Sequence, residues 1–202
     1  MKKFIVLVFV CLSLHSFAQS DEEKPPAKKG FQKDRLFTGG SATIGFSSYS
    51  TILGIDPQLG YSITSWADVG VNLNLNYTSQ RDYQTYGDKL RQTVYGPGAF
   101  ARLFPVKFLF ASAQYEYNII HVKYIPVNNG PYNKYSVNAS SLLLGAGYAG
   151  GRDMGNNTYY FLSISWDVLG DKNSPYIDGL GRSSPIIRAG YNIGLFQGRR
   201  RY

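Results

Sequence analysis

From residue 69 to residue 77, apolar and polar side chains alternate without a break. A period of two places alternate side chains on opposite faces of an extended strand, whereas a helix would scatter them around its axis. This stretch therefore predicts a β-strand with one apolar and one polar face. The apolar face consists of Val69, Val71, Leu73, Leu75 and Tyr77, and the polar face of Gly70, Asn72, Asn74 and Asn76.

The same alternation recurs along most of the 202-residue chain. About eight such segments follow one another between Leu36 and Phe196, each long enough to cross a bilayer as a tilted strand. No run after residue 18 has the length of a transmembrane helix. The predicted fold is all-β: a closed antiparallel transmembrane β-barrel of about eight strands with up-and-down topology. The clearest alternation lies at residues 42–47, 58–63, 69–77, 97–103, 109–117, 142–149, 160–168 and 187–195.

The predicted connections also alternate in character. Short turns on one side and long polar loops on the other are typical of an outer-membrane barrel, in which the turns are periplasmic. An even number of strands would then place both termini in the periplasm. The short connections are expected at 64–68, 104–107 and 150–156, and the long ones at 78–93, 122–136 and 169–185.

A soluble barrel of the lipocalin type, or a β-sandwich, is the rival interpretation. A soluble surface usually carries more Lys and Glu than the polar face does here, whereas small polar residues suit a narrow lumen. Aromatic residues near the strand ends favour membrane girdles. The outer girdle is predicted from Phe46, Tyr77, Tyr95, Tyr117 and Trp166, and the inner one from Trp66, Tyr148 and Tyr160.

The two ends of the chain differ from this pattern. Lys2 and Lys3 precede a short apolar run, and small residues end at Ala18, so residues 1–18 are predicted to be a signal peptide cut before Gln19. Its removal takes away Cys11, the only cysteine, and lowers the formal net charge from +8 to +6. Residues 19–35 are expected to be a disordered periplasmic tail, 36–196 the barrel, and 197–202 a basic C-terminal tail.

Several segments resemble the small outer-membrane β-barrel family, with the OmpA and OmpX membrane domains as the familiar architecture. The resemblance covers residues 36–196, and it implies a fold more than a function, because this family hosts many roles. The last segment resembles the assembly signal of a closing strand, but the chain continues past Phe196 to Tyr202. The segments that carry the resemblance are 57–64 (PQLGYSIT), 98–104 (GAFARLF), 145–148 (GAGY) and 187–196 (IRAGYNIGLF).

Four charged residues on the predicted inward face are the candidate site. Asp167 and Arg188 flank one hairpin loop and are expected to pair at similar depth, because a buried charge needs a partner. Glu116 and Arg102 also face inward, but at different heights, so no pair between them is predicted. We interpret the four as a structural lumen network rather than a gate, since eight strands leave an interior just filled by side chains.

Other motifs carry less chemistry. Residues 145–150 match G-x-G-x-x-G, but a turn follows where a dinucleotide site needs a helix, so no cofactor is predicted. His121 with Ser136 or Ser140 would be the centre of a lipid-modifying enzyme, but a Ser–His mechanism also needs an orienting acid. We therefore predict no catalytic residue and no metal site, and the modest, scattered positive charge is no sign of nucleic-acid binding.

These observations predict a non-catalytic structural or binding module in the outer membrane of a Gram-negative bacterium. Its partners would be outer-membrane lipid and, through the tyrosines of the long loops, an envelope or extracellular protein. Two alternatives remain: a narrow channel or subunit of a transport or secretion complex, and a lipid-modifying membrane enzyme. The loop tyrosines are Tyr83, Tyr86, Tyr124, Tyr132, Tyr135 and Tyr176.

Overall fold

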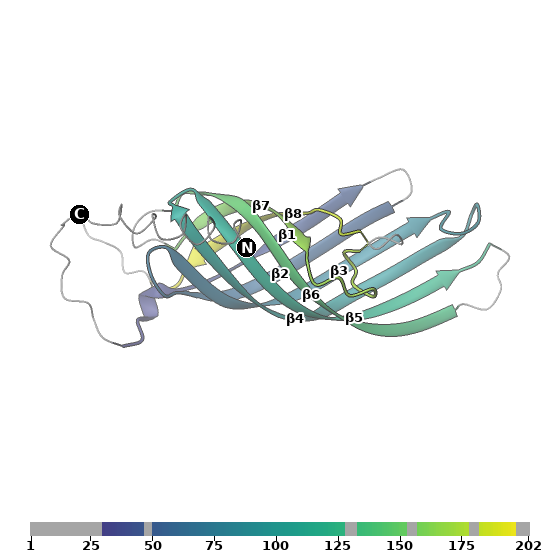
Figure 1. Cartoon of the computed structure of the whole chain (residues 1–202), viewed down its shortest axis with the longest axis horizontal. Coiled ribbons are helices and arrows are strands. Elements are labelled where there is room, and N and C mark those ends of the chain that lie inside the picture. Colours follow the sequence, from purple (N-terminus) through teal and green to yellow (C-terminus); the bar gives the residue numbers. More distant parts are fainter. Residues whose placement is uncertain (1–29, 47–49, 128–132, 153–156, 178–181, 197–202) are drawn as a thin grey trace, which may run out of the picture. The chain divides into compact units, whose positions relative to one another are not determined.

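The computed structural model contains eight antiparallel strands, each hydrogen-bonded to its neighbours in chain order, that close into one barrel (Figure 1). The structure describes residues 30–46, 50–127, 133–152, 157–177 and 182–196. The predicted up-and-down barrel is therefore confirmed. The strands are β1 (Leu36–Phe46), β2 (Ser50–Ser62), β3 (Ala67–Arg81), β4 (Lys89–Val106), β5 (Leu109–Ile125), β6 (Asn133–Gly150), β7 (Tyr159–Asp167) and β8 (Ile186–Gly194).

Closure takes place between the first and last strands. β1 pairs with β8 from Phe37 opposite Gly194 to Ala42 opposite Ala189. Because closure leaves no free edge along this ladder, the backbone groups there bond to each other rather than needing solvent.

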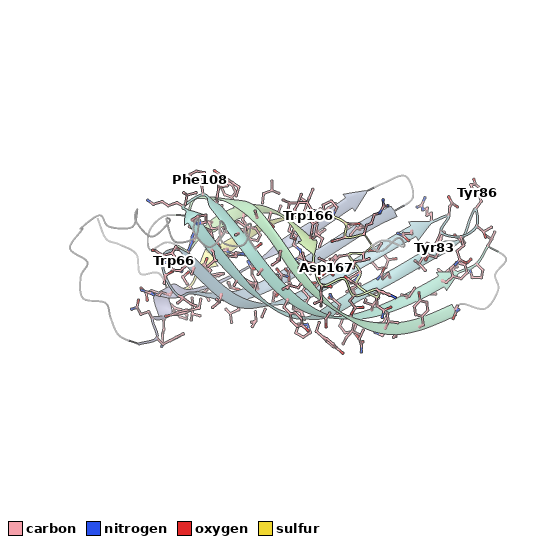
Figure 2. All side chains as sticks on the ribbon, in the orientation of Figure 1. Trp66, Tyr83, Tyr86, Phe108, Trp166 and Asp167 are labelled. Atoms are coloured by element: carbon pink, nitrogen blue, oxygen red, sulfur yellow. The ribbon has the colours of Figure 1, made fainter. Side chains whose placement is uncertain are left out.

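The barrel has two unlike ends. At the short-turn end, β4 and β5 are joined at Lys107 and Phe108, and β2 and β3 at residues 63–66. At the long-loop end, the β3–β4 and β5–β6 hairpins reach beyond β7 and β8 (Figure 1). Figure 2 places Trp66 and Phe108 at the short-turn end and Tyr83 and Tyr86 at the other.

Two predicted loops are mostly strand. Residues 78–93 and 122–136 were expected to be irregular, yet β3 and β4 pair continuously to Arg81 opposite Lys89. β5 and β6 likewise pair to Tyr124 opposite Asn133. Most outward residues in these extensions are polar. The alternation of apolar and polar residues therefore stops in the sequence, although the hydrogen-bonded pairing of the strands continues. The prediction of long loops was wrong at these two places, whereas the β7–β8 connection is long as expected.

The predicted N-terminal tail also ends earlier than expected. Lys33–Arg35 form a 3-10 turn, and the Arg35 guanidinium donates a hydrogen bond of 2.7 Å to the carbonyl of Ile63. The backbone N–H of Gln32 donates to the Tyr61 hydroxyl at 3.2 Å. Residues 32–35 are thus held against the short-turn end, because a backbone carbonyl and a tyrosine hydroxyl of the barrel supply polar partners. The predicted signal peptide, the tail up to residue 29 and the tail at 197–202 lie outside the described residues.

The outward face of the strands is apolar. Val71 is 58% exposed, and Leu162 and Ile187 are exposed to a similar extent on distant strands. The predicted girdle residues with described side chains all point outward as well; the side chain of Phe46 lies outside the described residues. Those exposed girdle residues are Tyr77, Tyr95, Tyr117 and Trp166, and at the short-turn end Trp66, Tyr148 and Tyr160.

Inside the barrel, phenylalanine rings lie over glycines. Phe37 pairs with Gly60 across β1 and β2, and a Cβ on Gly60 would come within 2.1 Å of the ring. The missing side chain lets the ring cover the neighbouring strand, an arrangement that also shields the glycine backbone. Each of the four directly opposed pairs uses a different pair of strands. The other three are Phe100–Gly70, Phe110–Gly147 and Phe161–Gly190.

Helices contribute little to the described structure. Among the described residues, no helix is both long and apolar enough to cross a membrane.

Candidate functional site in the barrel lumen

A cluster of buried charges lies inside the barrel around Arg188 of β8. Its guanidinium is 2.9 Å from Glu116 Oε1 on β5 and 3.4 Å from Asp56 Oδ2 on β2. All three side chains are nearly inaccessible to solvent. Gln114 donates to both carboxylates, at 2.8 Å to Glu116 and 3.2 Å to Asp56. The cluster therefore ties together three strands that are far apart in the sequence.

The β7–β8 loop folds back into this cluster. The hydroxyl of Tyr176 donates to Glu116 Oε2 at 2.7 Å and lies 3.1 Å from the Asn74 amide nitrogen. Ser174 donates to Asp167 at 2.5 Å, and its hydroxyl is 3.0 Å from that of Ser141 on β6. Tyr176 was predicted to be an exposed contact residue, and that prediction is wrong. Its side chain is an internal plug because its hydroxyl is a partner that buried Glu116 can use.

The predicted pair between Asp167 and Arg188 does not form. Arg188 lies opposite Ser163, whereas Asp167 lies beyond the last β7–β8 pair, Ser165 and Ile186. Asp167 therefore lies nearer the long-loop end, where it accepts hydrogen bonds from the backbone N–H groups of Leu142 and Leu169. The expectation failed because the register of the two strands, and not the length of the loop between them, sets the depth of each residue.

Arg102 forms a second layer, closer to the short-turn end. Its guanidinium lies 4.6 Å from the ring centre of Phe100 and 4.5 Å from that of Phe161. It also donates to Gln58 at 2.8 Å. Stacking on aromatic faces and a polar contact together stabilise a buried cation. Arg102 faces inward as predicted, with partners other than Glu116.

A third ionic contact closes the short-turn end. Arg152 lies 3.0 Å from Asp68 of β3, and its guanidinium is 3.6 Å from the ring centre of Phe104. Asp68 also accepts from Ser62 at 2.7 Å. Both charged side chains are almost fully buried. This pair was not predictable from the sequence, because Arg152 lies in a predicted turn, where charged residues are normally solvated.

Little space remains between the layers. The cavity bounded by Asp56, Arg102 and Arg188 has a volume of about 20 Å³. That is close to the ~10–15 Å³ that a single water molecule needs. Within the described part of the chain, the middle of the lumen is thus packed with side chains, as expected for eight strands.

Two members of the central cluster were missed in the sequence. Asp56 lies within β2, just before residues 58–63, where the predicted alternation begins. Asp56 and Gln58 are two positions apart and so lie on the same face of the strand. The inward side predicted for Gln58 therefore also applies to Asp56. For Tyr176 no periodic signal exists, because it lies in a loop whose path depends on the filled lumen.

His121 lies on the outward face, at the long-loop end. Its Nδ1 is 2.8 Å from the Ser136 hydroxyl, and its Nε2 is 3.0 Å from the Tyr95 hydroxyl. The register places His121 directly opposite Ser136, which explains the contact. Ser140 instead contacts Tyr115 at 3.1 Å. Both imidazole nitrogens thus face hydroxyl groups, and neither faces the carboxylate that orients the histidine of a Ser–His–Asp triad.

The long loops present fewer tyrosines than expected. Tyr83 and Tyr86 are 51% and 88% exposed at the tip of the β3–β4 hairpin, and Tyr135 is exposed on β6. Tyr124 is half-buried and donates to Asp88 at 3.0 Å. Tyr132 lies outside the described residues. Of the described loop tyrosines, two exposed ones therefore lie together on one hairpin tip.

Asp88 organises that tip. Its carboxylate accepts hydrogen bonds from the backbone N–H groups of Tyr83, Gln84 and Thr85, at 2.6, 2.9 and 2.9 Å. Desolvation alone would raise the pKa of Asp88, but these donors and the Tyr124 hydroxyl outweigh it and hold the pKa below the usual 3.8. The charged carboxylate is thus the form that fits the loop.

We expect the β3–β4 tip to loosen in acid. A carboxyl group whose pKa is lowered on folding stabilises the loop fully above its unfolded value of 3.8, and this contribution is lost as the pH falls through the lower folded pKa. Amide exchange at Tyr83, Gln84 and Thr85, corrected for the intrinsic pH dependence, should therefore lose protection below pH 3.8. In an Asp88→Asn variant, protection should be low and unchanged over this range. Equal acid sensitivity in both proteins would contradict the assignment.

Comparison with known proteins gives structural likeness only. No protein-family model and no curated protein sequence matches the chain. The N-terminal β-barrel domain of Pseudomonas aeruginosa OprF is 13% identical over 79% of this chain and 98% of that chain, with a TM-score of 0.45. Neisserial surface protein A (NspA) is 13% identical over 79% of this chain and 95% of that chain, with a TM-score of 0.41. These loose superpositions transfer no function.

The fold therefore rests on the molecule's own register and closure. Eight strands in chain order, one closing ladder and a mid-lumen filled by side chains are all present. The expected architecture is confirmed: the strands form a closed, up-and-down antiparallel barrel of eight strands.

Proposed function

We propose that this protein spans the outer membrane of a bacterium as a sealed barrel and acts there as a structural and binding module, without catalytic activity. The observation that carries the proposal is the filled lumen. Three layers built around buried arginines, Arg188, Arg102 and Arg152, follow one another along the barrel interior.

The outward face supports the membrane part of the proposal. Isolated exposed apolar residues are ordinary in soluble proteins, but a continuous apolar belt around a barrel is not. In lipid the same belt is favourable, because the closed ladder satisfies the backbone and the tyrosines and tryptophans suit the two interfaces. The belt reaches every strand, with Ile44, Leu59, Val71, Ala99, Leu109, Leu144, Leu162 and Ile193 among its exposed members.

A binding role is favoured over a channel. The cavity of about 20 Å³ in mid-lumen is too small for a hydrated ion path. The exposed Tyr83 and Tyr86 at the β3–β4 tip are residues of a type enriched at protein interfaces. We therefore place the protein contact at this hairpin tip, with both chain termini on the opposite, periplasmic side.

The enzyme alternative has one observation in its favour, which is the 2.8 Å contact between Ser136 and His121. Against it stands the Tyr95 hydroxyl, which occupies the ring nitrogen where an orienting acid would act. We therefore interpret the group Tyr95–His121–Ser136 as an interfacial hydrogen-bond chain.

Single-channel recording in planar bilayers tests the sealed lumen. The wild-type protein should show no resolved ion conductance, because side chains fill each layer of the lumen. A double variant, Arg102→Ala with Tyr176→Ala, should raise the conductance because it removes one large side chain from each of two layers. Channels of defined conductance in the wild type would overturn the proposal and favour the transport alternative. Tryptophan fluorescence of Trp66 and Trp166 in the same membranes controls for insertion.

A further inference from the structure

The wall of the barrel has a gap between β1 and β8 toward the long-loop end. β1 pairs with β2 along its whole length, up to Phe46. On its other side β1 pairs with β8 up to Ala42 opposite Ala189. Continuation of that ladder would bring Ile44 opposite Ile187, but no such pairing is present within the described residues. Figure 1 shows β1 and β2 reaching beyond β8 toward the long-loop end.

A cavity lies behind this gap, at the long-loop end of the lumen. Its volume of about 580 Å³ is within the ~300–1,000 Å³ that is usual for small-molecule sites. Buried Tyr176, which donates to Glu116, lines it on the side of the central cluster. We call this cavity the vestibule, and its inward-facing lining includes Thr43, Ile52, Thr78, Gln80, Leu90 and Gln92.

The vestibule continues through the gap to the outer surface of the barrel. Ile44 and Ile187 also line it, although both side chains point outward and are exposed. Outward residues of two strands can border a lumen cavity only where the wall between those strands is open. An unpaired strand edge is tolerated at membrane depth where it lines such a cavity, because the backbone groups there can find polar partners.

The gap opens onto the apolar belt. The register places Ile44 opposite Leu53, and Leu53 opposite the girdle residue Tyr77. On the other side of the gap, Ile187 lies opposite Ile164 of β7, which is an exposed member of the belt. The opening therefore faces lipid acyl chains at the long-loop border of the belt.

The interior of the vestibule is amphipathic and uncharged. None of its described lining residues carries a charge. Ile52 has the same parity as inward Asp56 and yet is 37% exposed, so it offers apolar surface inside the lumen. Thr78 and Gln92 lie opposite each other across β3 and β4. Within the described part of the chain, neither side chain nor that of Gln80 has a hydrogen-bond partner.

This lining selects for an uncharged polar group. A charged ligand would meet no counter-charge in the vestibule, and a buried charge without a partner is strongly unfavourable. A hydroxyl group can both donate and accept, as can the side chains of Thr78, Gln80 and Gln92. The apolar border of the gap suits a hydrocarbon chain instead.

We propose that the vestibule binds a single-chain lipid with an uncharged, hydroxyl-bearing headgroup, whose acyl chain passes through the gap into the membrane. The inference rests on the proposed membrane function and names a ligand class for the barrel. The headgroup contacts Thr78 and Gln92, and the chain lies between Ile44 and Ile187. Tyr176 and the central cluster below it still block passage across the membrane, so the site is compatible with a sealed barrel.

Photolabelling of the full chain in phosphatidylcholine nanodiscs tests the proposal. The probe is a monooleoylglycerol analogue with a diazirine in its acyl chain, and mass spectrometry maps the labelled residues. Label should concentrate at Ile44, Ile52 and Ile187, well above the label on belt residues such as Leu59, and excess monooleoylglycerol should suppress it. Oleoyl-lysophosphatidylglycerol has the same chain and a negative charge, and it should compete about tenfold less well or worse.

Two variants with the same new side chain test the position of the site. Thr78→Trp fills the vestibule and should reduce the label there by about tenfold or more, because the ring overfills the space that the ligand needs. Ser79→Trp is the matched control, since it places the same ring on the next residue of β3, on the outward face. Its label should equal that of the wild type.

A third variant keeps the test decisive if Thr78→Trp does not fold. Gln92→Leu retains the size of the side chain but removes its amide group. It should weaken capture of the probe by roughly fivefold, the usual effect of losing one neutral hydrogen bond. Urea unfolding of each variant, followed by the fluorescence of Trp66 and Trp166, verifies that the barrel is folded.

Three outcomes would overturn the inference: equal label in Thr78→Trp and Ser79→Trp, label spread evenly around the apolar belt, or equal competition by the charged and uncharged lipids. Failure here is distinguishable from failure of the proposed function. A non-conducting barrel that captures no monooleoylglycerol would remove only the vestibule site. A conducting barrel that captures it would remove only the sealed-module proposal.

Discussion

Replacement of Arg188 by methionine is expected to lower the free energy of unfolding by about 3–5 kcal/mol, the usual loss when one partner of a buried ion pair is removed. The variant leaves Glu116 and Asp56 close together in the lumen without the cation that both contact. Two buried carboxylates without a counter-charge are strongly unfavourable. Urea unfolding in detergent, followed by the fluorescence of Trp66 and Trp166, measures the loss.

Two further variants separate charge balance from lost packing. Lys172→Met removes an exposed cation from the β7–β8 loop and should change stability by less than about 0.5 kcal/mol. Adding Glu116→Gln and Asp56→Asn to Arg188→Met should recover part of the stability, because the uncompensated negative charge is gone. If the triple variant is less stable than Arg188→Met, the cluster is held by hydrogen-bond geometry rather than by charge balance.

The second large effect is expected at Gly60. A Cβ at this position would come within 2.1–2.8 Å of three atoms of the Phe37 ring, and no other atom is closer. Phe37 is fully buried, so the ring has little room to move. Gly60→Val should therefore lower the free energy of unfolding by about 1–3 kcal/mol, the range for overpacking.

A double-mutant cycle tests the cause. Phe37→Ala alone removes a buried ring and should be destabilising by about 3–5 kcal/mol. Phe37→Ala combined with Gly60→Val should be clearly less destabilised than the sum of the two single variants, because the new methyl groups occupy space that the ring leaves. Urea unfolding in detergent gives all three values. Strict additivity would show that Gly60 is needed for its backbone rather than for the ring above it.

β3 shows which part of a strand can be predicted from the sequence. The alternation at Val69–Tyr77 predicts both β3 and its outward face, because burial in lipid demands an apolar side chain at every second position. The same alternation fails beyond Tyr77, where Ser79 and Arg81 still point outward but into a polar surrounding. Hydrophobic periodicity depends on the surroundings of the outward side chains. It therefore stops at the edge of the apolar belt, although the strand continues.

In the candidate site, the face of each charged residue was predictable from the sequence, but its partner was not. Parity along each strand was enough to place Arg102, Glu116, Asp167 and Arg188 on the inward face, because the side-chain period of a strand is two. The partner of each charge was not predictable from one chain. Arg188 meets Glu116 across the lumen and not Asp167 across the hairpin, since closure and register bring together strands that are distant in sequence.

The sequence by itself determined the fold class of this protein. An alternating pattern is repeated about eight times, with aromatic residues near the strand ends and turn residues between the strands. This pattern is compatible with a closed barrel, because each strand of a barrel needs one apolar face and one enclosed face. Only the tertiary structure decided what the barrel contains and presents. The Phe37–Gly60 contact, the return of Tyr176 into the lumen and the contact of Arg188 with Glu116 all depend on strand register. Register fixes depth and opposition between residues far apart in the chain, and a periodic pattern of period two looks the same after every shift by two residues.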